Sequence, residues 1–351
     1  MISIQTANHA SQAQWDDFVL SRPDASPYHL FAWGRAIEEA YGHRLYYLTA
    51  LKENKFAGIL PLVNMKFPAL LNDLTGLPFC DVGNCLSKNK EVQNALAAEA
   101  LALGARLKAK KITLRGRLHD SVIKKQHFAR EDNQKVRMLL TLPPSSEILL
   151  KNFKSKLRSQ IRKAEKNGVT FRWAGEDGVE SFYAVFCQNM HDLGSPVHSR
   201  QWFRAIMKNY GNNARIGLTE FEGKCIGAGL ILSTNEQTAI PWASTLRQYN
   251  RQAPNMLLYW NCLKFAADNG KKTFDFGRST KNEGTFRFKK QWGAEPAALP
   301  WYTFSPNVKR QDTDNTRAKP AKREMAAEIW KKIPLPVANL LGPQLRKYIN
   351  L

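Results

Sequence analysis

Residues 33–42 read WGRAIEEAYG, and residues 202–211 read WFRAIMKNYG. Six residues recur at identical spacing in these two segments: Trp33/Trp202, Arg35/Arg204, Ala36/Ala205, Ile37/Ile206, Tyr41/Tyr210 and Gly42/Gly211. Self-similarity between distant segments is the signature of a duplicated structural unit. A duplication is therefore the first organising feature of this chain.

The segments that follow the two copies also correspond. Each copy is followed by alternating apolar residues around a polar turn, the pattern of a β-hairpin, with turns at Glu53-Asn54 and Glu222-Gly223. An apolar helical run and a short strand come next, at residues 95–116 and 256–277. The order helix, hairpin, helix, strand therefore occurs twice. It predicts an α/β protein with two tandem domains, each a mixed sheet flanked by helices.

The segment LPPSSE (142–147) interrupts the pattern between the halves. We therefore expect an N-terminal domain over residues 1–145, a C-terminal domain over residues 146–305 and a tail over residues 306–351. Residues 306–328 have the polar composition of a linker.

The last part of the tail, residues 329–351, is apolar and has cations beside it. Pro334, Pro336 and Pro343 exclude one continuous helix in this segment. It is expected either to contact an anionic membrane surface or to dock on its own domain.

Composition narrows the class of protein. Hydrophobic residues make up 43% of the 351 residues, which excludes disorder over most of the chain. Lys and Arg number 52 against 30 Asp and Glu, a formal net charge of +22. This charge attracts polyanions, whether nucleic acid, anionic lipid or phosphorylated substrates, and does not choose among them.

The five cysteines have neither zinc-ligand nor redox CxxC spacing, so no metal is expected. The N-terminal segment lacks the pattern of a signal peptide, and no apolar run reaches the roughly 18 residues needed to span a bilayer. We expect the protein to be cytoplasmic, with the tail as its route to peripheral contact with the cytoplasmic face of the membrane.

Five segments carry a resemblance to a known family: SPYHLFAWGRAIEEAYGH (26–43), GLPFCDVG (76–83), KSKLRSQIRKAEKNGV (154–169), APNMLLYWNCLKFAADNG (253–270) and FDFGRSTKNEGTFRFKKQWGAEPAALPW (274–301). Over residues 5–305 the chain resembles the FemAB-type acyltransferases, which have tandem GNAT-like domains. More narrowly, it resembles the FemAB-like proteins associated with exopolysaccharide and exosortase/PEP-CTERM systems. The resemblance implies acyl or aminoacyl transfer to a cell-envelope precursor. Acyl-CoA or aminoacyl-tRNA would be a co-substrate, with no tightly bound cofactor.

The resemblance places catalysis in the second half, at Phe288 and Lys289. A fixed ammonium can stabilise the oxyanion of acyl transfer, or hold a donor phosphate. Alternatively, Lys289 is a solvated surface lysine. Asp275 lies on an otherwise apolar strand and is expected either to accept a proton from the attacking amine or to be a structural partner of Arg278 or a backbone amide. The corresponding first-half strand, KKITLRG, lacks these groups, so we expect the first half to be a scaffold or acceptor platform.

Donor phosphates are expected at the helix that begins after Pro254, where Arg247, Arg251 and Asn255 accompany free backbone N–H groups. The glycine-rich loop by which GNAT enzymes hold coenzyme A is missing here, which favours a transfer-RNA donor. Further phosphate contacts are assigned to Arg278 and to Arg158. Arg158 lies on a predicted basic helix with an apolar stripe that ends at Gly168. The alternatives are an ordinary helix start and a solvated charged face.

The acceptor is expected between the halves, beside Tyr28, His29, Trp33, Asp81 and His191. The favoured alternatives are a structural role for His29 and packing for Asp81. Fem enzymes that act on nucleotide-linked precursors often have a lysine where this chain has Ile37, which argues against that acceptor. The favoured function is N-acyl or aminoacyl transfer to an amine of an envelope or exopolysaccharide precursor. The alternatives are O-acylation of a polysaccharide from acyl-CoA, and a non-catalytic protein that binds nucleic acid or membrane.

Overall fold

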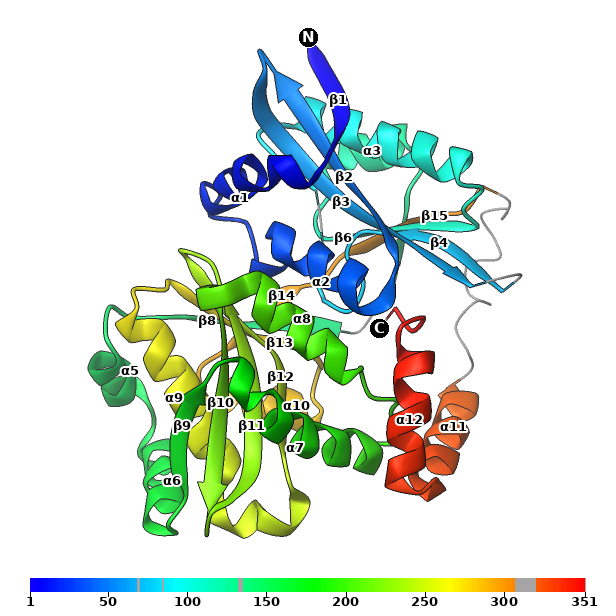
Figure 1. Ribbon diagram of the computed structural model, residues 1–351. Coiled ribbons are helices and arrows are strands. Elements are labelled where there is room, and N and C mark those ends of the chain that lie inside the picture. Colours follow the sequence, from blue (N-terminus) through cyan, green and yellow to red (C-terminus); the bar gives the residue numbers. More distant parts are fainter. Residues whose placement is uncertain (68–69, 84, 132–134, 307–319, 351) are drawn as a thin grey trace. The chain divides into compact units, whose positions relative to one another are not determined.

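The computed structural model describes residues 1–67, 70–83, 85–131, 135–306 and 320–350, and its chain forms two compact units. The first unit comprises residues 1–134, 298–318 and 348–351, and the second comprises residues 135–297 and 319–347. Figure 1 shows that each unit has its own sheet with helices packed on it.

The first unit has a mixed sheet. Its strands are β1 (Ile2–Ala7), β2 (Arg44–Lys52), β3 (Lys55–Phe67), β4 (Leu71–Thr75), β5 (Leu86–Ser87), β6 (Lys111–Arg115), β7 (Ala129–Glu131) and β15 (Trp301–Phe304). Its helices are α1 (Gln12–Leu20), α2 (Phe31–Tyr41), α3 (Lys90–Arg106) and α4 (Asp120–Lys125). The strands follow the order β1-β2-β3-β4-β6-β15-β7, and β5 pairs with β3. The pair β4/β6 is parallel.

The second unit repeats this arrangement. Its strands are β8 (Lys135–Thr141), β9 (Thr170–Ala174), β10 (Ala214–Phe221), β11 (Lys224–Ser233), β12 (Gln237–Thr245), β13 (Thr273–Thr280) and β14 (Glu295–Ala298). Its helices are α5 (Ser146–Asn152), α6 (Ser155–Lys166), α7 (Val179–Asp192), α8 (Arg200–Tyr210), α9 (Pro254–Asp268), α10 (Gly284–Gln291), α11 (Pro320–Lys332) and α12 (Leu335–Arg346). The strand order is β14-β8-β13-β12-β11-β10-β9, with β12/β13 parallel.

The predicted duplication is confirmed element by element. The repeated segments form α2 and α8, and each leads into a hairpin whose turn residues, Glu53-Asn54 and Glu222-Gly223, all have positive φ. Two consecutive residues with positive φ are the geometry of a tight type I′ hairpin turn. The helix that follows, α3 or α9, then connects β4 to β6 or β12 to β13. Two mixed sheets flanked by helices are thus the observed fold class.

The two units exchange strands with respect to the domains expected from sequence. Strand β8 lies before residue 145 but pairs with β13 in the second sheet. Strand β15, which follows the second unit in sequence, pairs with β6 and β7 in the first sheet. Hydrogen bonding and core packing decide this, because the alternating pattern of β8 fits either sheet and the four residues of β15 carry no pattern that selects one.

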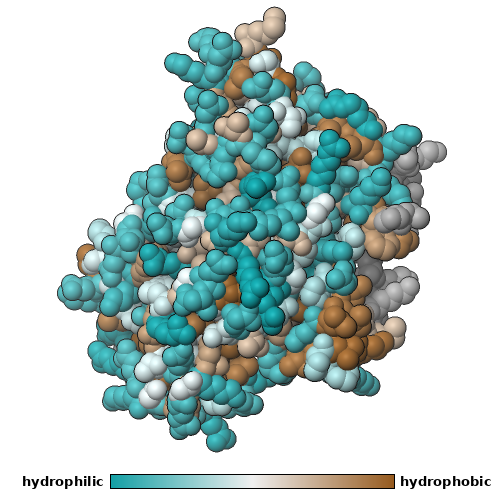
Figure 2. Space-filling model, viewed as in Figure 1, coloured by the Kyte–Doolittle hydropathy of each residue, from teal (hydrophilic) through white to brown (hydrophobic). Residues whose placement is uncertain are grey.

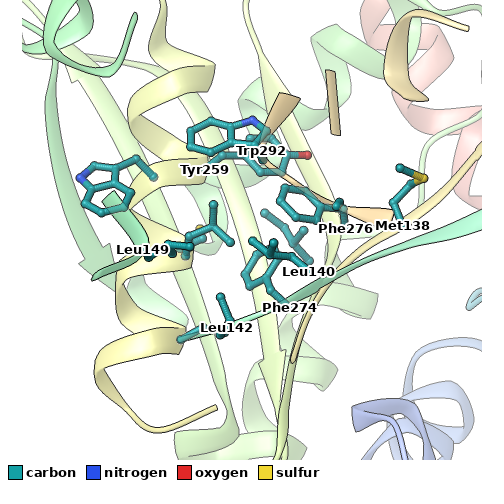
Figure 3. Close-up of a cluster of buried hydrophobic side chains, with 14 of the residues drawn as sticks. Met138, Leu140, Leu142, Leu149, Tyr259, Phe274, Phe276 and Trp292 are labelled. Carbon is teal, nitrogen blue, oxygen red and sulfur yellow. The ribbon is translucent and has the colours of Figure 1, made fainter. Parts of the chain in front are cut away.

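Helices cover both faces of the second sheet. Helix α7 packs on β11 and β12 at one face, and α9 packs on β10, β11 and β12 at the other, where α5 and α6 pack against α9. Figure 3 shows the core on the α9 face, where Phe274 and Phe276 of β13 and Leu140 of β8 lie near Tyr259 and Trp292. Burying these side chains is the main source of stability.

The tail differs from the linker expected over residues 306–328, because helix α11 already begins at Pro320. Residues 307–319 lie outside the described part of the chain. The expected interruption of the helix is found between α11 and α12, but Pro343 lies inside α12. In the described part of the chain, no helix is long and apolar enough to cross a membrane.

The repeated tryptophans are core residues of their units, since Trp33 and Trp202 are both fully buried. We predict that Trp202→Ala lowers the free energy of unfolding by about 3–5 kcal/mol, because it leaves a large cavity. The neighbouring Arg204→Ala is the control: it removes only an exposed ion pair with Glu180 and should cost no more than about 1 kcal/mol. Urea denaturation measures both changes. Equal losses for the two variants would contradict the assignment.

Candidate functional site

Two β-bulges separate the parallel strands β12 and β13 of the second sheet. The strands pair from Gln237 to Ala239 and from Thr273 to Asp275, and each then contains a bulge. Ile240 and Pro241 together oppose one residue of β11, and Phe276 and Gly277 together oppose Met138 of β8. Gly277 has φ +72°, which favours glycine, and Pro241 lacks an N–H for a ladder. Beyond this point β12 and β13 therefore no longer pair with each other.

The ends of β12 and β13, which no longer pair with each other, form the candidate site. Ligands of open α/β sheets bind outside the carboxyl ends of the strands, where neighbouring connections diverge. Because α9 connects β12 to β13, its N-terminus lies at this same edge of the sheet. The edge thus combines the end of β13 from Phe276 to Thr280, the end of β12 and the start of α9.

A buried polar network fixes the strands where they separate. Arg137 Nε donates a hydrogen bond to Asp275 Oδ2 (2.6 Å), and Arg137 Nη2 donates one to Gln237 Oε1 (2.9 Å). The Gly277 N–H donates to Asp275 Oδ1 (2.8 Å), and only 1% of the Asp275 side chain is exposed. Asp275 is therefore engaged through both oxygens, and one of its partners is the backbone amide that sequence had offered as an alternative.

Lys289 lies at the bulge of β13. Its Nζ donates hydrogen bonds to the carbonyl oxygens of Gly277 (3.2 Å) and Arg278 (2.8 Å), and only 8% of the residue is exposed. The alternative of a solvated surface lysine is therefore wrong. An ammonium group this deeply buried is retained only where hydrogen bonds stabilise it, and these two bonds place its charge at the end of β13.

Aromatic packing of α10 positions Lys289. Phe288 makes a T-shaped contact with Tyr259 of α9 (5.0 Å between ring centroids), and Tyr259 stacks on Phe276 of β13 (5.6 Å). Trp292 is fully buried beside Tyr259, as Figure 3 shows. Phe288 is thus partly buried against the core, and its contact with Tyr259 fixes the helix turn that carries Lys289.

The bulge of β13 also decides which side chains face α9. Ser279 pairs with Val136, which belongs to the α9 core, whereas Arg278 pairs with Arg137 on the opposite face. Ser279 is 3% exposed, and among the described residues its hydroxyl has no hydrogen-bond partner. A buried hydroxyl without a partner is costly, so Ser279 is a ligand-contact candidate. Sequence reasoning did not select it, nor did it select Arg137.

The start of α9 is the second part of the candidate site, and its first turn offers few free N–H groups, because Pro254 has none and the Met256 N–H donates to the Ala253 carbonyl (3.0 Å). The 3₁₀ helix η5 (Arg247–Gln252) precedes Ala253, which has a left-handed backbone (φ 57°) and is followed by Pro254 at the first helical position. Arg247 and Arg251 are exposed and Asn255 is half-buried. Asn167, which ends α6, donates to the Arg251 carbonyl (3.2 Å) and so holds η5 in place. Arg247 and Arg251 thus share η5 and Asn255 lies in the first turn of α9, but the Arg247 guanidinium faces the Asp192 carboxylate of α7 (3.9 Å from Nε to Oδ2).

Arg158 lies apart from the start of α9. The predicted basic helix is α6, with Leu157, Ile161 and Ala164 buried. Arg158 precedes Asn167 by nine residues, roughly 13 Å along a helix at 1.5 Å per residue, and its Nη1 donates to the Lys151 carbonyl (3.3 Å). Lys166 is an exposed cation of α6 that directly precedes Asn167, the residue that contacts η5.

The expected acceptor residues of the first unit are packed in its core. Tyr28, His29 and Trp33 are buried, with a hydrogen bond from the Ser26 N–H to His29 Nδ1 (3.0 Å) and one from Trp33 Nε1 to the Pro78 carbonyl (3.1 Å). Asp81 is half-buried, and its carbonyl accepts from Trp301 Nε1 (3.1 Å).

His191 belongs to the second unit. It lies on α7, and its Nε2 is 2.7 Å from the Ile333 carbonyl between α11 and α12. This contact places it beside the tail helices.

The corresponding edge of the first unit is filled by its own residues. Beyond β4 the chain remains hydrogen-bonded to β6. The Gly76 N–H donates to the Thr113 carbonyl (2.8 Å), and the Gly83 N–H donates to the Arg115 carbonyl (3.0 Å). The Arg115 guanidinium is buried and donates to the carbonyl of Cys80 (2.6 Å) and to Asn350 Oδ1 (2.6 Å). The two units thus share a topology but differ where the candidate site lies.

Other catalytic chemistries find little support in the described residues. No cluster of three or more His, Cys, Asp or Glu side chains with the geometry of a metal site occurs among them. Burial raises the pKa of Cys187 and of Cys225 to about 11. These thiols are therefore protonated near neutral pH and are poor nucleophiles.

Comparisons with known proteins agree with this geometry. Residues 151–290 match the model of the acetyltransferase (GNAT) domain. The fold is similar to the crystal structure of FemX (TM-score 0.71, 15% identity, covering 87% of this chain and 98% of that one). It is also similar to a tandem GNAT protein from the clavulanic acid biosynthesis pathway (TM-score 0.57, 13% identity, 88% and 100%).

A third similar structure is the C-terminal domain of a putative lysylphosphatidylglycerol synthetase from Agrobacterium fabrum (TM-score 0.57, 9% identity, 85% and 92%). At these identities the structural likeness shows the fold alone. No curated protein matches the sequence.

The polar network at the separation of β12 and β13 makes a testable stability claim. We predict that Arg137→Met lowers the free energy of unfolding by about 3–5 kcal/mol, because it leaves the Asp275 carboxylate buried without its cation. Arg172→Met is the matched control: it removes an exposed arginine–carboxylate pair with Glu220 in the same sheet and should cost about 1 kcal/mol or less. Similar losses in urea denaturation would show that the network does not hold the strands.

Proposed function

We propose that this acyltransferase, a FemAB-like protein of the GNAT superfamily, joins an acyl or aminoacyl group to an amine of a cell-envelope or exopolysaccharide precursor. The observation that carries the proposal is the separation of β12 from β13, with a buried ammonium, Lys289, held at the point where β13 bulges. A carbonyl group bound between the strands would lie beside a fixed positive charge.

The donor is assigned to the edge of the second sheet. Its phosphates would meet the remaining free N–H groups at the start of α9 and the cations Arg247 and Arg251. Its reactive carbonyl would lie between β12 and β13, near Ser279. Both acyl-CoA and aminoacyl-tRNA present a phosphate and an activated carbonyl. The absence of a glycine-rich loop before α9 and the exposed cations of α6 favour the transfer-RNA donor.

The chemistry follows from these positions. The acceptor nitrogen forms a bond to the donor carbonyl carbon, and the carbonyl oxygen gains negative charge in the tetrahedral intermediate. The C–S bond of a thioester or the C–O bond of an ester then breaks, and the leaving thiol or hydroxyl takes up a proton. We assign to Lys289 the stabilisation of the oxyanion.

Asp275 is assigned a positioning role. Its two oxygens already accept hydrogen bonds from Arg137 and Gly277, so the proton of the attacking amine is assigned to water. Phe288 likewise acts through the helix turn that carries Lys289. Arg278 and Arg158 lie outside the anion site at the start of α9, and we assign them to more distant phosphates of a large donor.

Substitution of Lys289 tests the proposal. Lys289→Met should lower kcat/KM by about 100-fold or more, because it removes the charge that stabilises the oxyanion. The neighbouring Lys290 is exposed, so Lys290→Met should change kcat/KM by about twofold or less. Lys289→Arg keeps the charge and should retain more activity than Lys289→Met.

Each variant is offered aminoacyl-tRNA and acyl-CoA separately, with amine-bearing envelope precursors. Thermal unfolding confirms that it is folded. Resistance of the product to hydroxylamine distinguishes an amide from an ester. A folded Lys289→Met variant with wild-type kcat/KM on the donor that is consumed would overturn the assignment.

A further inference from the structure

Large apolar side chains are exposed along the two tail helices. On α12 these are Val337, Leu340, Leu341 and Leu345, and Leu340 is 74% exposed. On α11 they are Met325 and Ile329, with 62% and 57% exposed. Figure 2 shows hydrophobic residues gathered over the position of α12. Contiguous apolar patches on a protein surface mark interaction sites.

The face of α12 that contains Ala338 and Gly342 packs on the second unit. Ala338 is 2% exposed, and Gly342 lies so close to Val197 that an added Cβ would be 2.9 Å from its backbone nitrogen. At 3.6 residues per turn, Leu340 lies nearly opposite these two small residues, whereas Leu341 and Leu345 flank the packed face and are 45% and 49% exposed. If the only role of α12 were to pack on α7, a helix with its leucines buried would stabilise the protein more than one with these leucines exposed.

Cations accompany the exposed leucines. Lys331 and Lys332 end α11 and are exposed, whereas Arg346, the last residue of α12, and Lys347 after it are half-buried. Residues 306–351 contain ten Lys and Arg against four Asp and Glu, and the whole chain has a formal net charge of +22. An apolar stripe with cations beside it, on a helix roughly 18 Å long, suits the boundary between the headgroups and acyl chains of an anionic membrane.

We propose that α11 and α12 dock the protein on the surface of an anionic lipid bilayer. The leucines of α12 enter the headgroup region, and the lysines at the end of α11 contact lipid phosphates. If the occupant were a second copy of the chain, the lysines of the two copies would lie near one another and repel. A nucleic acid has no apolar surface against which the leucines could be buried. The docking surface concerns where the enzyme acts and is independent of the acyl donor and of Lys289.

The test is co-sedimentation of the full chain with vesicles, without any acyl donor. Vesicles of phosphatidylcholine alone are compared with vesicles containing about one third phosphatidylglycerol. We expect binding to the anionic vesicles only. The double variant Leu340→Gln/Leu345→Gln should weaken that binding about tenfold or more, since it removes two inserted side chains. Lys331→Gln/Lys332→Gln should weaken it about tenfold in low salt.

Matched controls come from exposed residues elsewhere. Ile148→Gln removes an apolar side chain of α5 that is 43% exposed, and Lys124→Gln/Lys125→Gln removes two exposed lysines of α4. Both controls should bind the anionic vesicles like the wild type. If the leucine variant also binds like the wild type, charge alone drives binding and the proposal is overturned. It is equally overturned if the wild type is a dimer that the leucine variant converts to a monomer, because the occupant is then a second copy.

Discussion

Two β-bulges, one in β12 and one in β13, are the constraint on which the rest of the candidate site depends. The last parallel pair of these strands is Ala239 with Asp275, and each bulge begins at the next residue, Ile240 in β12 and Phe276 in β13. Backbone groups that leave a ladder need other partners. Lys289 is one such partner, because its ammonium group donates hydrogen bonds to the carbonyl oxygens of Gly277 and Arg278. Below the bulges, Arg137 ties β8 to β13 and to β12, so the strands separate at one defined point.

The same constraint explains why one of two similar units carries the candidate site. Strand β6 pairs with β15 in a continuous register up to Arg115, without the bulge seen in β13. The chain beyond β4 remains bonded to β6, and Arg115 and Asn350 occupy the edge. A filled edge can stabilise a unit but offers no room for a donor. Duplication followed by filling of one copy is consistent with a scaffold role for the first unit.

Much of the fold could be predicted from the sequence, because it depends on local patterns. The repeated WxRAI segments, the two hairpin turns and the stripe of Leu157, Ile161 and Ala164 all gave the right elements. The exchange of β8 and β15 could not be predicted, because neither the alternation of β8 nor the four residues of β15 reveals which sheet the strand joins. Nor could the bulges, which depend on register between strands distant in sequence.

For the candidate site, the sequence led to the segment around Lys289 but not to its contacts. Lys289 in FRFKK was expected to be catalytic, with a solvated surface lysine as the alternative, and only the fold shows that it is buried beside the bulge of β13. Arg137 has the pattern of an outward-facing strand residue, and only the fold brings it to Asp275. Helix α11 was missed because its charged composition resembles that of a linker.

Hydrogen–deuterium exchange with a bound donor analogue tests the central claim most directly. The probes are a thioether analogue of acyl-CoA and, separately, an amide-linked aminoacyl-tRNA analogue. The account predicts slower exchange in peptides covering residues 246–257 and 276–281, at the start of α9 and the end of β13, with unchanged exchange over residues 111–116 of the first unit. Protection of residues 111–116 with no change over residues 276–281 would place the donor elsewhere and contradict the account.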